Sequence, residues 1–440
     1  MSHNKAIKSA LRALVLCPTA HEDKTLSVIH DLPEDFKEKY SFIFARWNSS
    51  KPFDLHQYTE ECIQLVNQEN VDLVVSGYDV GSIVHAALAD TFPHIRGPSV
   101  ESVFLTNHKY YGAKLFEPDI QSPMSTVLEL DADLETMLEK ANAFLQHVGG
   151  ICCIKPMTGH SSFGVQKVTG FEDLREAIVN LQNCHETQYV SENFTKKWID
   201  VETYPYCVSK CALLQEYIDP KMIATACMCV QDGNIKHFGI HDWYFDEKPA
   251  REGARTFLGG FAPSRVTPEE ETRVRMLTDT IVKKLMEKGF NDKFLDIEFF
   301  VLPNGEHKFL EVNGRLDCGM AIICRQLFDD EDLVQGLLKL GSGENIGERT
   351  PNGLHGMLGM VDTAASGRAE DILDYCEISK IPEITVNYSP GDHIPVTPDM
   401  YCTNLASIYL VGRTREELIQ KHYDICRRIL KKPELSPWGH

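Results

Sequence analysis

The chain has 440 residues, of which 43% are hydrophobic and 25% are charged, and it carries a formal net charge of -20. This composition excludes a disordered chain, and the length predicts several substructures that share a sizeable core. The acidic balance argues against binding to nucleic acids or anionic membranes, because both need a basic surface. No apolar run approaches the length of a bilayer span and no secretory leader is expected, so the sequence predicts a cytoplasmic protein.

The first part of the chain alternates strand-like and helical patterns. Apolar runs predict strands at 11–17, 41–47 and 71–77, with helical patterns at 53–68 and 81–92. This alternation is typical of βαβ units and a parallel sheet. Gly77, Tyr78 and Asp79 follow the third run, at the strand end where open α/β sheets bind ligands, although a simple turn explains these residues equally well.

A predicted helix starts at Ser99, which is a good cap residue, and continues through Lys109 and Lys114. Solvent exposure explains each lysine as well as a functional role does. After a second helix at 133–148, two strand-like runs flank a loop that follows Lys155-Pro156. The small residues of this loop, whose backbone N–H groups and hydroxyls can bind phosphate oxygens, are Gly159, Ser161, Ser162 and Gly164. A Walker NTPase is excluded, since Val165-Gln166 stands where Lys-Ser/Thr is required and a strand follows.

The next elements are a strand at 211–218, a strand pair at 223–230 and 235–240, and a helix at 268–289. A loop rich in Arg, Gly and aromatic residues, 251–265, separates this pair from the helix and is suited to binding a substrate. The 14 cysteines are scattered and form no Cys-x-x-Cys pair. We therefore expect free thiols, although Cys207 and Cys211 could hold a metal if further ligands lay nearby.

Residues 294–319 contain a predicted hairpin with its turn at Pro303-Asn304-Gly305. Asp296 and Glu298 share one face of the first strand, and the second strand places Glu311, Asn313 and Arg315 on one face. Antiparallel pairing can join these faces into one polar surface, whose carboxylate and amide oxygens suit Mg²⁺, while Arg315 suits a phosphate or carboxylate. The alternative to a metal site is a half-exposed hairpin whose solvent face is acidic.

After the hairpin, the sequence predicts helices at 321–336 and 415–431 and strands at 356–361, 384–386 and 406–411.

The hairpin, with Glu298 followed by Glu311-Val312-Asn313-Gly314-Arg315, resembles the metal-binding hairpin of the ATP-grasp superfamily of carboxylate-amine ligases. The Lys155-Pro156 strand and its Gly/Ser loop are similar to the lid of that family. The resemblance implies an α/β fold with a preliminary domain at 1–125, a lid subdomain at 126–218, a catalytic core at 219–345 and an accessory segment at 346–440. That segment resembles the C-terminal part of carnosine-synthase-like and L-amino-acid ligases.

The resemblance also implies roles for individual residues. ATP would be bound by Lys109, Lys155, the loop 159–164, and a hinge strand with Gln215, Glu216 and Ile218. Magnesium, or manganese as a substitute, would be bound by Glu298, Glu311 and Asn313. Catalysis would rely on Lys155 and Arg315, and the candidate substrate-binding residues are His241, Trp243, Arg255 and Arg315.

The implied activity is ATP-dependent formation of an amide or peptide bond through an acylphosphate. Its substrates would be a small carboxylate and an amine, with amino acids among them. A homodimer is one assembly that the resemblance allows. Two alternatives stay open. One is an ATP-grasp carboxylase or phosphoryl-transfer enzyme. The other is a non-catalytic ATP-binding regulator, for which loss of a metal ligand would be expected.

Overall fold

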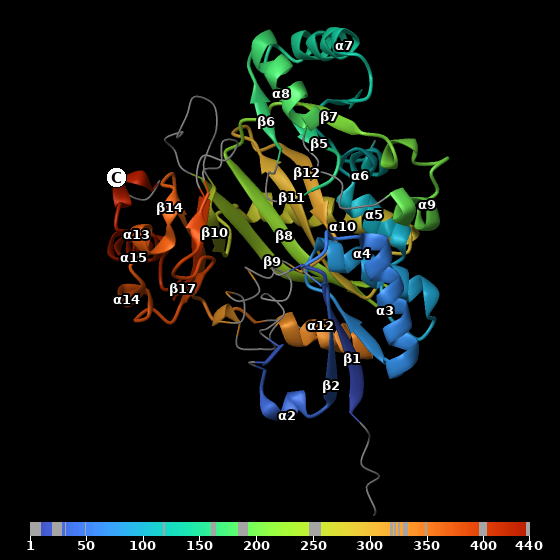
Figure 1. Ribbon diagram of the computed structural model, residues 1–440, viewed down its shortest axis with the longest axis vertical. Helices are drawn as coiled ribbons and strands as arrows, with labels where there is room; N and C mark the ends of the chain where they lie inside the picture. The colour runs from blue at the N-terminus through green and yellow to red at the C-terminus, as the bar shows by residue number, and fades with distance from the viewer. Residues whose placement is uncertain are drawn as a thin grey trace, which may run out of the picture.

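The computed structural model describes most of the chain, namely residues 10–19, 29–30, 32–48, 50–117, 119–159, 164–183, 192–245, 257–316, 320, 323, 326–328, 333–347, 350–395 and 403–436. Within these ranges no helix is long and apolar enough to cross a membrane. Figure 1 shows a large central sheet with three smaller bodies around it: the N-terminal strands, a lid that carries α7 and α8, and a C-terminal lobe.

The N-terminal body confirms the predicted alternation of strands and helices. Its parallel sheet has the order β2-β1-β3, and its elements are β1 (Leu11–Cys17), α2 (Glu34–Lys37), β2 (Tyr40–Arg46), α3 (Leu55–Glu69), β3 (Leu73–Val75) and α4 (Asp79–Thr91). The central strand is buried from Ala13 to Leu16, which explains its continuous apolar run. Asp54 caps α3 by accepting a hydrogen bond from the backbone of Gln57.

The lid is a four-stranded sheet with the order β4-β7-β5-β6. The elements from the N-terminal body to the end of the lid are α5 (Val100–Asn107), α6 (Lys109–Phe116), β4 (Ser125–Glu129), α7 (Leu134–His147), β5 (Cys152–Pro156), β6 (Gln166–Val168), α8 (Phe171–Asn183), α9 (Glu192–Trp198), η2 (Pro205–Cys207) and β7 (Cys211–Glu216). The predicted strand after Gly164 is present, in agreement with the exclusion of a P-loop, which would continue into a helix.

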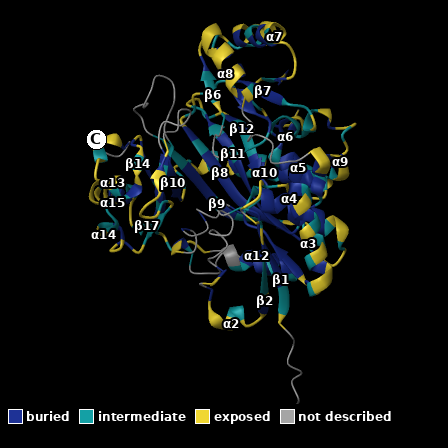
Figure 2. Ribbon diagram, in the orientation of Figure 1, coloured by how far each residue is buried: buried dark blue, intermediate teal, exposed yellow. Residues whose placement is uncertain are grey.

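The central sheet has eight strands in the order β12-β11-β8-β9-β10-β13-β17-β15. Its strands and neighbouring helices are β8 (Met222–Gln231), β9 (Asn234–Phe245), β10 (Phe257–Ala262), α10 (Pro268–Glu287), β11 (Lys293–Val301), β12 (His307–Asn313), α12 (Leu333–Ser342), β13 (His355–Thr363), β14 (Gly367–Arg368), α13 (Ala369–Ile372), α14 (Tyr375–Ile378), β15 (Ile384–Val386), β16 (His393–Ile394), β17 (Thr403–Gly412), α15 (Arg415–Ile429) and η3 (Pro433–Leu435). Figure 2 shows that most of these central strands are buried.

Two sequence expectations need correction here. The strand predicted at 235–240 continues through His241 and Trp243 to Phe245, and the helix after the hairpin is described from Leu333 to Ser342, beyond the expected end at 336. The last three strands of the central sheet come from the predicted accessory segment, so that segment continues the sheet. The division into four domains remains a prediction.

Candidate active site

Two carboxylates and an amide meet on the hairpin of β11 and β12. The register places Glu298 opposite Glu311 and Asp296 opposite Asn313, and the Asn313 side chain donates a hydrogen bond of 3.2 Å to Glu298 Oε1. The expected polar surface is therefore present. Among the described residues no group of three His, Cys, Asp or Glu side chains forms a complete metal site. Two carboxylates and an amide oxygen nevertheless fit Mg²⁺, which keeps several waters and binds nucleotide phosphates.

The two glutamates have different electrostatic surroundings. Burial and the neighbouring charge of Glu311 raise the pKa of Glu298 to about 8. Burial also opposes ionisation of Glu311, but Lys109, Lys155 and Arg315 outweigh it and hold the pKa of that carboxyl below its usual value. The negative charge is therefore concentrated on Glu311. A bound divalent cation would reduce the repulsion between the two carboxylates.

Lys109 reaches this site because the chain bends sharply at His108. The predicted helix is divided into α5 and α6, and the side chain of His108 caps α6 by accepting from the backbone of Tyr111. Burial lowers the pKa of His108 to about 3, so the ring is neutral and can accept. Lys109 Nζ then lies 3.3 Å from Glu311 Oε2 and 2.7 Å from the carbonyl oxygen of Gly159.

The rival lysine, Lys114, points elsewhere. Its ammonium pairs at 2.9 Å with Glu117, and both side chains are nearly half exposed. Lys114 does not line the pocket, whereas Lys109 does. Lys109 is thus the better candidate for phosphate binding.

Lys155 is buried at the end of β5 and donates a 2.7 Å hydrogen bond to Gln215 Oε1. Burial and the nearby charge of Lys109 lower the pKa of Lys155 to about 8. The family resemblance places Gln215 in the adenine-binding hinge, and that role remains a prediction. In this structure its side chain also positions Lys155. The neighbouring Glu216 accepts from Lys308 at 3.0 and 3.2 Å and from the backbone of Met124.

The remaining nucleotide candidates lie in the lid and after the hinge. Gly159 and Gly164 have φ of +111° and +69°, which favour glycine. Ser161 and Ser162 lie outside the described residues. Ile218 follows β7 and is partly buried in the connection to β8. The roles of all these residues in nucleotide binding remain predictions.

Arg315 and two of the other substrate candidates lie beside the hairpin. Arg315 Nη1 lies 3.1 Å from Asp296 Oδ2. The registers place Glu298 opposite Thr225 and Thr225 opposite His241, so these side chains share one face of the sheet. The rings of His241 and Trp243 are in edge contact, with centroids 4.8 Å apart. Arg255 lies outside the described residues.

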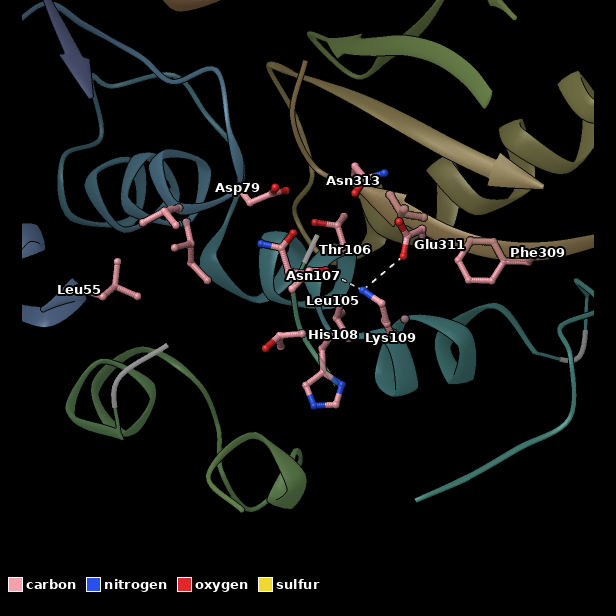
Figure 3. Close-up of a pocket in the computed structure, with 16 residues that line it drawn as sticks. Leu55, Asp79, Leu105, Thr106, Asn107, His108, Lys109, Phe309, Glu311 and Asn313 are labelled. Carbon is pink, nitrogen blue, oxygen red and sulfur yellow. Dashed lines mark hydrogen bonds and ion pairs between the residues drawn. The ribbon is translucent and has the colours of Figure 1, made fainter. Parts of the chain in front are cut away.

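One pocket joins the N-terminal body to the hairpin and the start of the lid loop (Figure 3). Its lining residues come from three bodies of the protein and are Leu55, Asp79, Val80, Ile83, Leu105, Thr106, Asn107, His108, Lys109, Gly112, Thr158, Gly159, Phe309, Glu311, Val312 and Asn313. The sequence identified Lys109, Gly159, Glu311 and Asn313 as site candidates, and it left Asp79 open between a ligand-binding position and a simple turn. The position of Asp79 in the pocket agrees with the first of these alternatives, because it follows a buried strand of the parallel sheet.

The glycine in the Glu-x-Asn-Gly-Arg run allows the hairpin to approach α5. A Cβ atom on Gly314 would lie 2.4 Å from Thr106 Oγ1, which is closer than real Cβ contacts. Thr106 is buried and donates to the carbonyl oxygen of Val103, so it cannot move freely. The close approach brings the metal-binding candidates next to the residues of α5 and α6.

Comparisons with known sequences give one distant relative. No protein-family model matches the chain. Human mitochondrial pyruvate carboxylase is 24% identical over 300 residues, which are 67% of this chain but 23% of that protein, so the chain corresponds to less than a quarter of that relative.

Solved structures align over nearly the whole chain. The L-amino acid ligase from Bacillus licheniformis has a TM-score of 0.71 at 14% identity and covers 96% of this chain and 98% of its own. Carboxyaminoimidazole ribonucleotide synthase from Aspergillus clavatus, complexed with ATP, has a TM-score of 0.67 at 12% identity, with 96% and 99% covered. Biotin carboxylase from Campylobacter jejuni has a TM-score of 0.63 at 15% identity, with 97% and 93% covered. Together with the site geometry, these alignments show that the chain has the ATP-grasp fold.

Proposed function

We propose that this protein is an ATP-dependent ligase that joins a carboxylate to an amine, with an amino acid among its substrates. The observation that carries the proposal is the convergence of Glu311 and Asn313 with Lys109 and the lid residue Gly159 around one pocket. Glu298 lies beside them, opposite Glu311 and hydrogen-bonded to Asn313. Such a site combines oxygen ligands for Mg²⁺ with cations for phosphate oxygens. Cytoplasmic location and assembly as a homodimer belong to the same proposal.

In the proposed reaction, a carboxylate oxygen of the acid attacks the γ-phosphorus of ATP, and the bond to the bridging oxygen of ADP breaks. The amine then attacks the acyl carbon, and phosphate leaves with one former carboxylate oxygen. Lys109 and Lys155 stabilise the phosphate oxygens, and Arg315 orients the acid. Mg²⁺, when bound by Glu298, Glu311 and Asn313, supplies neutralisation of the phosphate charge, and Mn²⁺ would substitute for it.

The described cysteines near the lid sheet fit this route better than covalent thiol catalysis. Burial raises the pKa of Cys152 and of Cys211 to about 12, so neither forms a thiolate at neutral pH. An acylphosphate route needs no side-chain nucleophile.

ADP release in the presence of Mg²⁺, ATP and paired amino acids tests the proposal, with mass detection of the product. When the acid carries heavy oxygen in its carboxylate, the label should appear in inorganic phosphate. Release of AMP and pyrophosphate, or of unlabelled phosphate during product formation, would contradict the acylphosphate route.

A carboxylase is the second candidate, because human pyruvate carboxylase and biotin carboxylase are among the similar proteins. Bicarbonate would then take the place of the acid. ADP release that depends on bicarbonate and not on amino acids would favour this alternative.

A further inference from the structure

The pocket of Figure 3 has two chemically different parts. One part contains Lys109, Gly159, Glu311 and Asn313, which we assign to the nucleotide and its metal. The other part is apolar, with buried walls formed by Leu55, Val80, Ile83 and Leu105. A molecule that occupied both parts would place a polar end at the phosphates and an apolar group between α3, α4 and α5.

Asp79 is a carboxylate in this pocket that the proposed reaction does not use. It is the first residue of α4, the helix that follows β3, and its side chain is only 16% exposed. Asp79 Oδ2 is buried and has no hydrogen-bond partner among the described residues. A buried polar atom without a partner costs free energy, so its presence needs an explanation.

Holding Arg315 does not provide that explanation. Asp79 Oδ1 lies 3.6 Å from Arg315 Nε, whereas the fully buried Asp296 lies closer, at 3.1 Å from Arg315 Nη1. The guanidinium also lies over the ring of Tyr78, 5.4 Å from its centroid. Because two other groups already fix Arg315, Asp79 can bind a ligand.

We propose that Asp79 binds the ammonium group of a free α-amino acid whose carboxylate is held by Arg315 and whose apolar side chain packs against Leu55, Ile83 and Leu105. This assignment rests on the proposed ligase function and names its acid substrate as an apolar amino acid with an unmodified amino group. An α-amino acid carries opposite charges on neighbouring groups, which matches the two opposite charges that Asp79 and Arg315 place side by side.

Calorimetric binding tests this inference with Mg²⁺ and a non-hydrolysable ATP analogue present. The probes are L-leucine and 4-methylpentanoate, which is leucine without its amino group. We expect the wild type to bind L-leucine at least tenfold more tightly than 4-methylpentanoate. Asp79→Asn should reduce this preference to less than twofold, and Asp79→Glu should retain part of it. The control Glu61→Gln changes an exposed carboxylate on α3 and should leave the preference unchanged.

Three outcomes would overturn the inference. The first is equal affinity of the wild type for the two probes, and the second is an equal loss of affinity for both probes in Asp79→Asn. The third is no binding of L-leucine while another acid supports ADP release. The second outcome would mean that Asp79 only positions Arg315. Failure of the ligase proposal would look different, since no acid would stimulate ADP release although leucine binding still depended on Asp79.

Discussion

Arg415 at the start of α15 connects the C-terminal lobe to the strand that carries His241 and Trp243. Its guanidinium makes two hydrogen bonds, of 2.8 and 2.9 Å, to the fully buried Asp242 on β9. It also lies over the ring of Phe261 at 3.9 Å from the centroid. We predict that Arg415→Met loosens α15 from the central sheet.

The expected cost follows from the burial of the pair. Removing one partner of a buried ion pair typically costs about 3–5 kcal/mol, because the other charge remains buried. Arg265 still pairs with Asp242 at 3.1 Å, but its side chain is 50% exposed and compensates only in part. With loss of the contact to Phe261 included, we expect a cost of about 3 kcal/mol.

Amide hydrogen exchange of α15 measures this cost, since a chain of several bodies need not unfold in a single transition. A loss of about 3 kcal/mol corresponds to roughly a hundredfold faster exchange in the helix. Adding Asp242→Asn should restore part of the protection, because the uncompensated charge is then gone. Arg413→Met, which replaces an exposed arginine two residues away, is the matched control. Exchange in α15 within twofold of the wild type in Arg415→Met would refute this reasoning.

Three further predictions concern other residues. Glu311→Gln should lower ATP turnover by roughly a hundredfold, because loss of a metal-binding charge costs about 3 kcal/mol. The control Glu306→Gln, on the exposed turn, should leave turnover unchanged. Wild-type ADP production by Glu311→Gln at saturating Mg²⁺ would show the metal assignment to be wrong. Burial raises the pKa of Asp362 to about 6, so the native state holds this proton more tightly than the unfolded chain and stability increases as pH falls from about 6 toward 4. Asp362→Asn should remove this pH dependence and raise the free energy of unfolding at pH 7 by roughly 2 kcal/mol. Equal urea midpoints for the wild type and Asp362→Asn at about pH 7 would contradict this prediction. Gly314→Ala should lower ATP turnover at least tenfold, since its Cβ would lie 2.4 Å from Thr106 Oγ1. Adding Thr106→Ala should restore part of the activity. Wild-type turnover by Gly314→Ala alone would show that the hairpin accommodates the Cβ without disturbing the site.

Local sequence patterns determined the elements that depend only on neighbouring residues. The apolar run at Leu11–Cys17 coincides with β1, and the alternation on either side of Pro303-Asn304-Gly305 predicted the antiparallel hairpin of β11 and β12. The lid strands around Lys155 followed from the same reasoning. The turn sets the register only as far as Phe299, which pairs with Phe309. A β-bulge between Glu298 and Phe299 then shifts the register by one residue, and this shift, which the sequence did not predict, places Glu298 opposite Glu311.

Tertiary structure alone decided the contacts between segments that are far apart in the chain. The pairing of β10 with β13 has no local signal, and neither has the hydrogen bond by which Gln215 positions Lys155. The position of Asp79 beside Arg315 depends on how the N-terminal body packs against the hairpin. Hydrophobic periodicity reports which face of an element is buried, but it does not report which partner covers that face, because apolar contacts are not directional.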